Sequence, residues 1–194
     1  MENKFNSRTL VLLLFMVVII GLRVIAPLSP DFKVIANFSA IGAVALFGGA
    51  YFKNTFNAFA LPMLVLLLSD IGLALVMGKD YGFYQGWYYT YIAFALMVLV
   101  GRILIKKVNI QNLFVASLAV VFIHWIVSDF GVWLGSTFYP QTLAGFWACL
   151  VAAIPFELNF LYGTLAYTAL MFGIFESLKA KYPVLSLKRD IAHS

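Results

Sequence analysis

The sequence predicts an all-α integral membrane protein that forms one membrane domain over residues 1–194. Its composition is 63% hydrophobic and only 11% charged, with a mean hydropathy of +0.97. A soluble domain is roughly half apolar and about a quarter charged. The apolar residues fall into long uncharged runs, and the lysines and arginines fall into alternate connections between them. Both patterns are typical of a multi-pass protein.

Six apolar runs are long enough to cross the bilayer. A hydrocarbon core of about 30 Å requires about 20 apolar residues in a helix. The runs predict spans at about 9–26, 34–52, 58–77, 87–105, 112–134 and 159–178. A further apolar piece, residues 141–155, is short and ends at a proline, which predicts a re-entrant or interfacial helix, or a broken extension of the last span. The brief connections leave no room for a soluble module.

The positive charges indicate the orientation of the chain. With six spans and an inner N-terminus, ten lysines and arginines lie on the inner side and three on the outer side. Cytoplasmic loops carry such an excess of cations, so both termini are predicted to be cytoplasmic. A seven-span arrangement would place the last four cations outside. The net charge of +5 is therefore attributed to the cations of the cytoplasmic side. It does not indicate a nucleic-acid partner, and none is expected.

The first apolar run has two interpretations. Lys4 and Arg8, followed by the apolar run and Val24-Ile25-Ala26, loosely resemble a signal peptide with its cleavage site. Arg23 beside the supposed cleavage site, together with the bulky run, favours a retained helix.

Polar residues within the spans are candidates for a binding site, because a charge at a helix centre costs about 2.5–3.5 kcal/mol on insertion scales. Most of them converge on the outer leaflet, which predicts an outward-facing pocket. The candidate substrate-binding residues are Asn37, Ser39, Asp70, Tyr88, Tyr91, His124, Asp129, Trp133 and Asn159. Of these, Tyr88, Tyr91 and Trp133 lie in aromatic, glycine-containing connections that form either an interfacial belt or a lid over a ligand.

Several of these residues have a structural alternative. Asp70 is a ligand contact, an ion-pair partner for Arg23 or a proton carrier. His124 is a structural histidine, bonded for example to Ser128 one turn on, or a ligand-coordinating one. The stretch NFSAIGAVALFGGAYF begins with the polar residues Asn37 and Ser39 and continues with small residues that permit close helix packing. Asn37 and Ser39 therefore either contact the ligand or serve only to cap and pack the helix.

The motifs that the sequence lacks narrow the function. One cysteine and no CxxC or HxxxH pair predict neither disulfide nor metal site, and no cofactor is expected. Without GxxxxGK[ST], the chain has no P-loop ATPase of its own. Without GxSxG or HExxH, no catalytic residues are assigned, and an intramembrane enzyme that uses His124 with Ser128 or Asp129 remains only an alternative.

Three segments, NFSAIGAVALFGGAYF, LPMLVLLLSD and SDFGVWLGSTFYPQTLAGFWACLVAAIPF, carry a family resemblance. Together they resemble the DUF6580 group of small bacterial membrane proteins, which are described as transport proteins and are similar to the S components of energy-coupling factor (ECF) transporters. The sequence departs from that pattern where Ala40 replaces a proline, Asp129 an asparagine and Gly163-Thr164 a Gly-Asp pair.

The resemblance implies a six-helix subunit in the bacterial inner membrane that binds a vitamin or other micronutrient near the outer face. It implies delivery through a transmembrane coupling protein driven by ATPase subunits. Cobalamin is one candidate ligand, with His124 as its cobalt ligand. A non-transporting membrane scaffold or assembly protein is the alternative, in which the small-residue faces contact a partner and the polar cluster is only structural.

Overall fold

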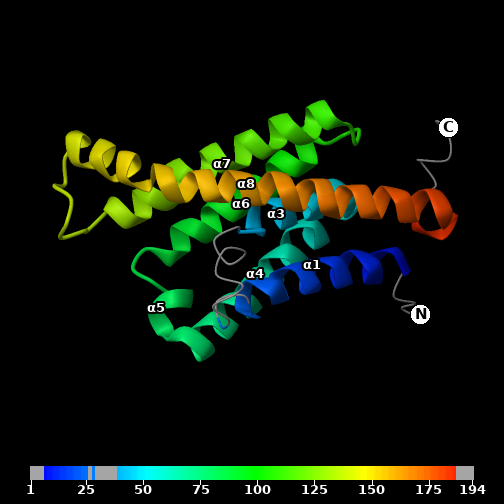
Figure 1. Ribbon diagram of the computed structural model, residues 1–194, viewed down its shortest axis with the longest axis horizontal. Helices are drawn as coiled ribbons and strands as arrows, with labels where there is room; N and C mark the ends of the chain where they lie inside the picture. The colour runs from blue at the N-terminus through cyan, green and yellow to red at the C-terminus, as the bar shows by residue number, and fades with distance from the viewer. Residues whose placement is uncertain (1–6, 26–27, 29–38, 187–194) are drawn as a thin grey trace.

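The computed structural model describes residues 7–25, 28 and 39–186, which form helices joined by short connections and contain no strand. The helices are α1 (Ser7–Ile25), α3 (Ile41–Tyr51), α4 (Thr55–Met77), α5 (Lys79–Gly82), α6 (Trp87–Leu104), α7 (Ile110–Trp133), α8 (Leu143–Lys181) and the short η3 (Pro183–Leu185). The long helices form a bundle along the long axis of the molecule (Figure 1). The all-α membrane class is thereby confirmed.

Within the described residues, five stretches are long and apolar enough to cross a bilayer: Ser7–Ile25, Thr55–Met77, Lys79–Leu104, Ile110–Trp133 and Leu143–Lys181. They correspond to five of the six predicted spans. The predicted second span, residues 34–52, contains α3, which has 11 residues and a length of about 16 Å. Residues 29–38, including Asn37, lie outside the described part of the chain.

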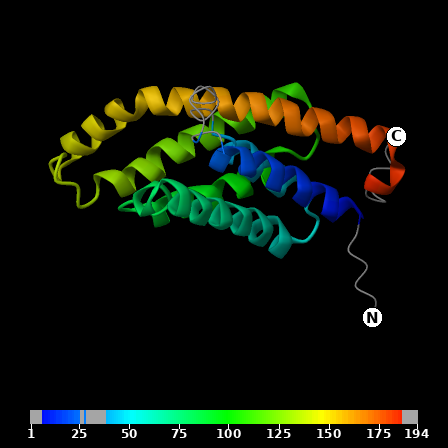
Figure 2. The same ribbon diagram turned by 60° about the horizontal axis from the view of Figure 1, so that its bottom comes forward.

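The prediction of a separate re-entrant or interfacial helix at residues 141–155 is wrong, and the alternative, an extension of the last span, is the one that forms, without a break. These residues form the first part of α8, a single helix of 39 residues that is about 58 Å long (Figure 2). The Thr142 side chain caps its start by accepting a hydrogen bond from the Gly145 backbone N–H, at 3.2 Å. Pro155 lies inside the helix, where it removes one backbone hydrogen bond without ending the helix. The helix boundary expected at this proline is therefore absent.

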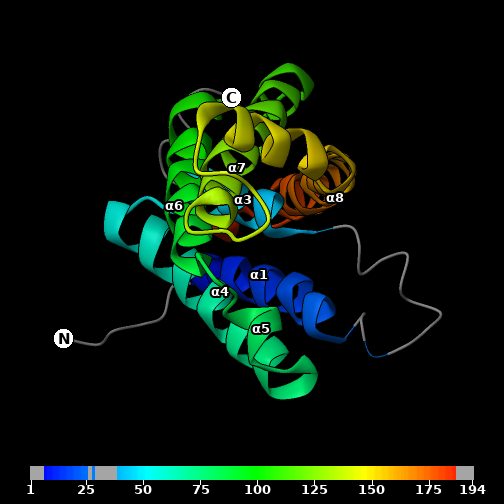
Figure 3. The ribbon, with the colours of Figure 1, turned by 90° about the vertical axis from the view of Figure 1, so that its left-hand side faces the viewer.

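Helix α3 occupies the centre of the bundle, with α6, α7 and α8 on one side and α1 and α4 on the other (Figure 3). Nearly all of its residues are buried. Its small residues allow this position: a Cβ atom on Gly49 would collide with the Val98 carbonyl of α6, and one on Gly101 of α6 would lie 2.5 Å from the Leu46 carbonyl of α3. The small flank of α3 therefore serves packing within the chain.

One end of the bundle, here called the Arg8 end, joins the first and last described segments. The Arg8 guanidinium is buried and donates hydrogen bonds to the carbonyls of Leu185 and, at 3.1 Å, Tyr51. It also lies over the rings of Tyr51 and Phe175. The opposite end, here called the Trp133 end, holds the C-termini of α1, α4 and α7 and the N-termini of α6 and α8.

The glycine contact between α3 and α6 makes a prediction about stability. Gly49→Leu should lower the unfolding temperature, because its Cβ would meet backbone atoms of α6 that cannot move aside; overpacking of this kind costs about 1–3 kcal/mol. Unfolding in detergent can be followed by labelling of Cys149, which is buried and is the single cysteine of the chain. Gly21→Ala is the control, since a Cβ there meets no atom within 4 Å. Equal labelling temperatures for Gly49→Leu and the native protein would contradict the packing argument.

Candidate functional site

Two groups of polar side chains contain the predicted site residues Asp70, Tyr91, His124 and Asp129. The first, here called the Arg23 cluster, contains Arg23 of α1, Ser69 and Asp70 of α4 and Tyr91 of α6. The second, here called the Glu157 cluster, contains His124 and Asp129 of α7 and Glu157 of α8. The predicted site residues Asp70 and Tyr91 therefore lie together, and His124 and Asp129 lie together elsewhere.

In the Arg23 cluster each polar group has a partner. Arg23 Nη1 lies 2.5 Å from Asp70 Oδ1 and 2.5 Å from Ser69 Oγ, and the Tyr91 hydroxyl donates to Asp70 Oδ2 at 2.8 Å. Both oxygens of the buried Asp70 carboxylate are thus occupied. Of the three roles considered for Asp70, the ion pair with Arg23 is the one observed. It connects α1 with α4, and the hydrogen bond from Tyr91 connects α6 to the same carboxylate.

The Glu157 cluster is different because its acceptors are not all used. His124 Nδ1 lies 2.8 Å from Glu157 Oε1, while Glu157 Oε2 is buried and has no hydrogen-bond partner in the described part of the protein. Asp129 lies in electrostatic range of both residues, and its Oδ2 is likewise buried without a partner among the described residues. Two carboxylate oxygens are therefore available to accept hydrogen bonds.

The Glu157 cluster lies deep in the bundle. His124 precedes Trp133, the last residue of α7, by nine positions, which places it about 14 Å along the helix from the Trp133 end. Glu157 meets His124 at the same level. The last span predicted from the sequence, residues 159–178, would put Glu157 at its outer start. This is corrected here, because α8 already begins at Leu143 and Glu157 lies well inside the helix. Burying carboxylates at this depth is costly, which marks the cluster as a functional candidate.

A hydroxyl network lies between the two clusters. Thr90 Oγ1 and Ser128 Oγ are 2.9 Å apart, and the Tyr84 hydroxyl bonds Thr90 and lies 3.4 Å from Ser128. Thr90 adjoins Tyr91 on α6, and Ser128 adjoins Asp129 on α7. Ser128 therefore bonds α6 rather than His124, so the serine–histidine pair considered from the sequence is not formed.

The remaining predicted site residues do not join either cluster. Trp133 donates from its indole N–H to the Pro140 carbonyl at 2.9 Å, which fastens the connection between α7 and α8. Tyr88 is half exposed and contacts neighbouring rings of α6. Ser39 accepts a hydrogen bond from the Ile41 N–H at 3.4 Å, and Asn159 is half-buried on α8.

Glu157 was not among the predicted site residues, although it is central to the second cluster. The sequence signal was the proline two positions before it, in IPFELNF, which left Glu157 either in the pocket or among the lipid headgroups. Its partner His124 is 33 residues away in the chain, so no local spacing connects the two.

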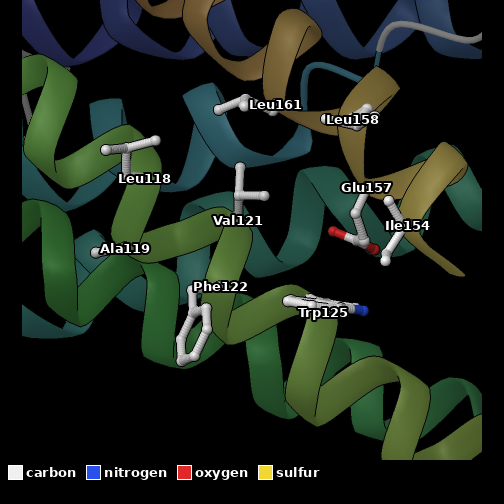
Figure 4. Close-up of a pocket in the computed structure, with 9 residues that line it drawn as sticks. All are labelled: Leu118, Ala119, Val121, Phe122, Trp125, Ile154, Glu157, Leu158 and Leu161. Atoms are coloured by element: carbon white, nitrogen blue, oxygen red, sulfur yellow. The ribbon is translucent and has the colours of Figure 1, made fainter. Parts of the chain in front are cut away.

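An open groove of about 600 Å³ lies beside the Glu157 cluster, between the middle of α7 and the middle of α8 (Figure 4). Glu157 is its single ionisable lining residue, and the rest of the lining is apolar, including Phe122, Trp125, Ile154 and Leu158. The Trp125 indole N–H donates to the Leu150 carbonyl at 2.9 Å. Among the described residues no group of three or more His, Cys, Asp or Glu side chains has the geometry to hold a metal ion.

The Arg23–Asp70 ion pair makes a prediction for a double-mutant cycle. Arg23→Met should cost about 3–5 kcal/mol of stability, because it leaves the Asp70 carboxylate buried without its cation. Arg23→Met combined with Asp70→Asn should recover most of that loss, since no uncompensated charge remains. The readout is the temperature at which Cys149 becomes reactive, with Lys79→Met, an exposed cation at the same end, as the control. A double variant that is additively worse than both single variants would contradict the ion-pair assignment.

Comparison with known proteins gives a family. No curated protein and no solved structure matches the chain. The family of unknown function DUF6580 matches residues 3–185, which is nearly the whole sequence and contains both polar clusters. The protein therefore belongs to the DUF6580 family.

Proposed function

We propose that this protein is a substrate-binding membrane subunit for the uptake of a small molecule, a vitamin or another micronutrient, and that the ligand binds at the Glu157 cluster. The observation that carries the proposal is the pair of buried carboxylate oxygens, Asp129 Oδ2 and Glu157 Oε2, without partners among the described residues. A buried acceptor left unpaired costs about 1–3 kcal/mol. A ligand that donates hydrogen bonds to both oxygens would remove that cost.

The charges of the cluster restrict the ligand. Two carboxylates face one imidazole, so the site favours a ligand with N–H or O–H donors or a positive charge over an anion. His124 uses Nδ1 for Glu157, which leaves Nε2 for a ligand atom. A carboxylate that orients a histidine in this way is the usual support of a metal-coordinating imidazole. Cobalamin, with His124 on its cobalt, remains one candidate.

The Arg23 cluster has a supporting part in this proposal. Asp70 and Tyr91 already bond each other, and Asp70 also bonds Arg23, so they hold α1, α4 and α6 in place around the bundle. Direct ligand contact is assigned to His124, Asp129 and Glu157. Asn159, two residues after Glu157 and half-buried, is the neighbouring polar group on α8.

The distribution of cations supports an inner-membrane orientation with the Arg8 end in the cytoplasm. Among the described residues, the Arg8 end carries Arg8, Lys53, Arg102, Lys106, Lys107, Lys179 and Lys181, whereas the Trp133 end carries Arg23 and Lys79. This is the asymmetry of the positive-inside rule. The Glu157 cluster then lies between the bilayer centre and the outer surface.

Active uptake in this proposal requires partner proteins. The sequence has no GxxxxGK[ST] motif, so the energy would come from ATPase subunits acting through a transmembrane coupling protein, as in ECF transporters. The scaffold alternative relied on small-residue faces that contact a partner. The glycines of α3 are used against α6, α4 and α8 of the same chain, which removes the main support for that alternative.

Native mass spectrometry of the protein, purified gently from membranes of a host grown with a full vitamin supply, tests the proposal. We expect a stoichiometric bound molecule of vitamin size, and ATPase subunits in the same preparation. A folded protein that carries no such molecule, and that binds none of a panel of water-soluble vitamins including cobalamin, would overturn the proposal.

The same measurement on variants tests the site. Glu157→Gln should weaken ligand retention about tenfold or more, because the amide replaces a charged acceptor and disturbs the bond to His124. Glu176→Gln is the matched control: it makes the same change on the same helix, at the Arg8 end, where Glu176 bonds Tyr51 and Lys179. Equal ligand retention by Glu157→Gln and Glu176→Gln would place the ligand elsewhere.

A further inference from the structure

A second groove lies at the Arg8 end, where α7 begins and α8 approaches its last turns. Its volume is about 550 Å³. Most of its lining is apolar, with Leu113 and Phe114 of α7 opposite Leu165 and Phe172 of α8. The groove is distinct from the one beside Glu157, which lies near the middle of the same two helices.

Two lysines directly precede the lining of this groove in the chain. The lining begins at Val108 and Asn109, and the two residues before them, Lys106 and Lys107, are exposed. No hydrogen bond or ion pair involves either ammonium group in the part of the chain that the structure describes. The turn that carries them is held in place because Asn112 Nδ2 donates to the Lys107 carbonyl, at 2.9 Å.

The acidic residue in the lining does not cancel this charge. Glu176 accepts a hydrogen bond from the Tyr51 hydroxyl at 2.5 Å and pairs with Lys179 Nζ at 2.8 Å. Its carboxylate is therefore already neutralised by Lys179, and it does not pair with Lys106 or Lys107, the exposed lysines beside the first lining residues in the chain.

A buried hydroxyl also points to an occupant. Thr168 of α8 lines the groove and is almost fully buried, yet its Oγ1 has no hydrogen-bond partner among the described residues. Burying a hydroxyl without a partner is unfavourable, and a molecule with an ester or hydroxyl oxygen in the groove would supply one.

We propose that this groove binds an anionic phospholipid, with the headgroup phosphate at Lys106 and Lys107 and part of an acyl chain between Leu113, Phe114, Leu165 and Phe172. Basic pockets between transmembrane helices on the cytoplasmic side bind anionic headgroups in this way. The site does not depend on the transport function.

Lipid retention measures this site directly. The full chain is incorporated into nanodiscs of equal parts phosphatidylglycerol and phosphatidylcholine, released into mild detergent, and its bound lipids are counted by native mass spectrometry. We expect phosphatidylglycerol to be retained in preference to phosphatidylcholine. Lys106→Gln combined with Lys107→Gln should lower its retention roughly ten- to thirtyfold, from about 1 kcal/mol for each lysine.

Two further variants separate the parts of the site. Gly173→Leu tests the acyl-chain seat without changing charge, because Gly173 lines the groove and a Cβ there meets no atom within 4 Å; it should also lower retention. Lys53→Gln combined with Lys79→Gln removes two exposed cations away from the groove and should leave retention unchanged. The labelling temperature of Cys149 shows that each variant is folded.

Three results would overturn the proposal. The first is equal retention of the two lipids by the native protein. The second is unchanged phosphatidylglycerol retention after loss of Lys106 and Lys107. The third is an unchanged retention in Gly173→Leu, which would show a headgroup held at the surface without a groove.

Discussion

The close packing of α3 is the constraint on which the rest of the structure depends. This short helix is buried among α6, α8, α4 and α1. The α6 backbone approaches it at Gly49, and the side chains of Thr164 of α8 and Pro62 of α4 fill the space that a side chain on Gly42 or Gly48 would need. In a bilayer, helix association gains little from the hydrophobic effect, so close van der Waals contact is the main source of stability. With α3 in this place, α6 and α7 lie on one side and α1 and α4 on the other (Figure 3).

The arrangement around α3 also decides how the polar groups are used. Arg23 and Asp70 lie on α1 and α4, which pack against each other, so their charges are neutralised within the bundle. His124 and Glu157 lie on α7 and α8 and bond each other, but two carboxylate oxygens, of Asp129 and Glu157, remain without partners in the described structure. A buried carboxylate thus forms a stabilising ion pair in the Arg23 cluster, whereas the Glu157 cluster keeps carboxylate oxygens that a ligand is proposed to use.

The two ends of the bundle differ in charge and in what they hold. The Arg8 end combines a buried arginine that connects the first and last described segments with exposed lysines beside an apolar groove. The Trp133 end is aromatic, with Phe130, Trp133 and Phe146 in mutual ring contact. The two proposals use this division: anionic lipid is proposed to bind at the Arg8 end, and the ligand at the Glu157 cluster, toward the Trp133 end.

The sequence by itself determined the all-α membrane class, five of the long helices and the small-residue face of α3, because hydropathy, run length and residue size are properties of local sequence. It predicted that Asp70 would pair with Arg23 as one of three alternatives. Only the tertiary structure decided between these alternatives. It also shows that His124 pairs with Glu157, which is 33 residues away, and that Ser128 bonds Thr90. It shows as well that α8 continues through Pro155. The physical reason is that a buried polar group or a proline takes its role from the helices packed around it, and those neighbours come from distant parts of the chain.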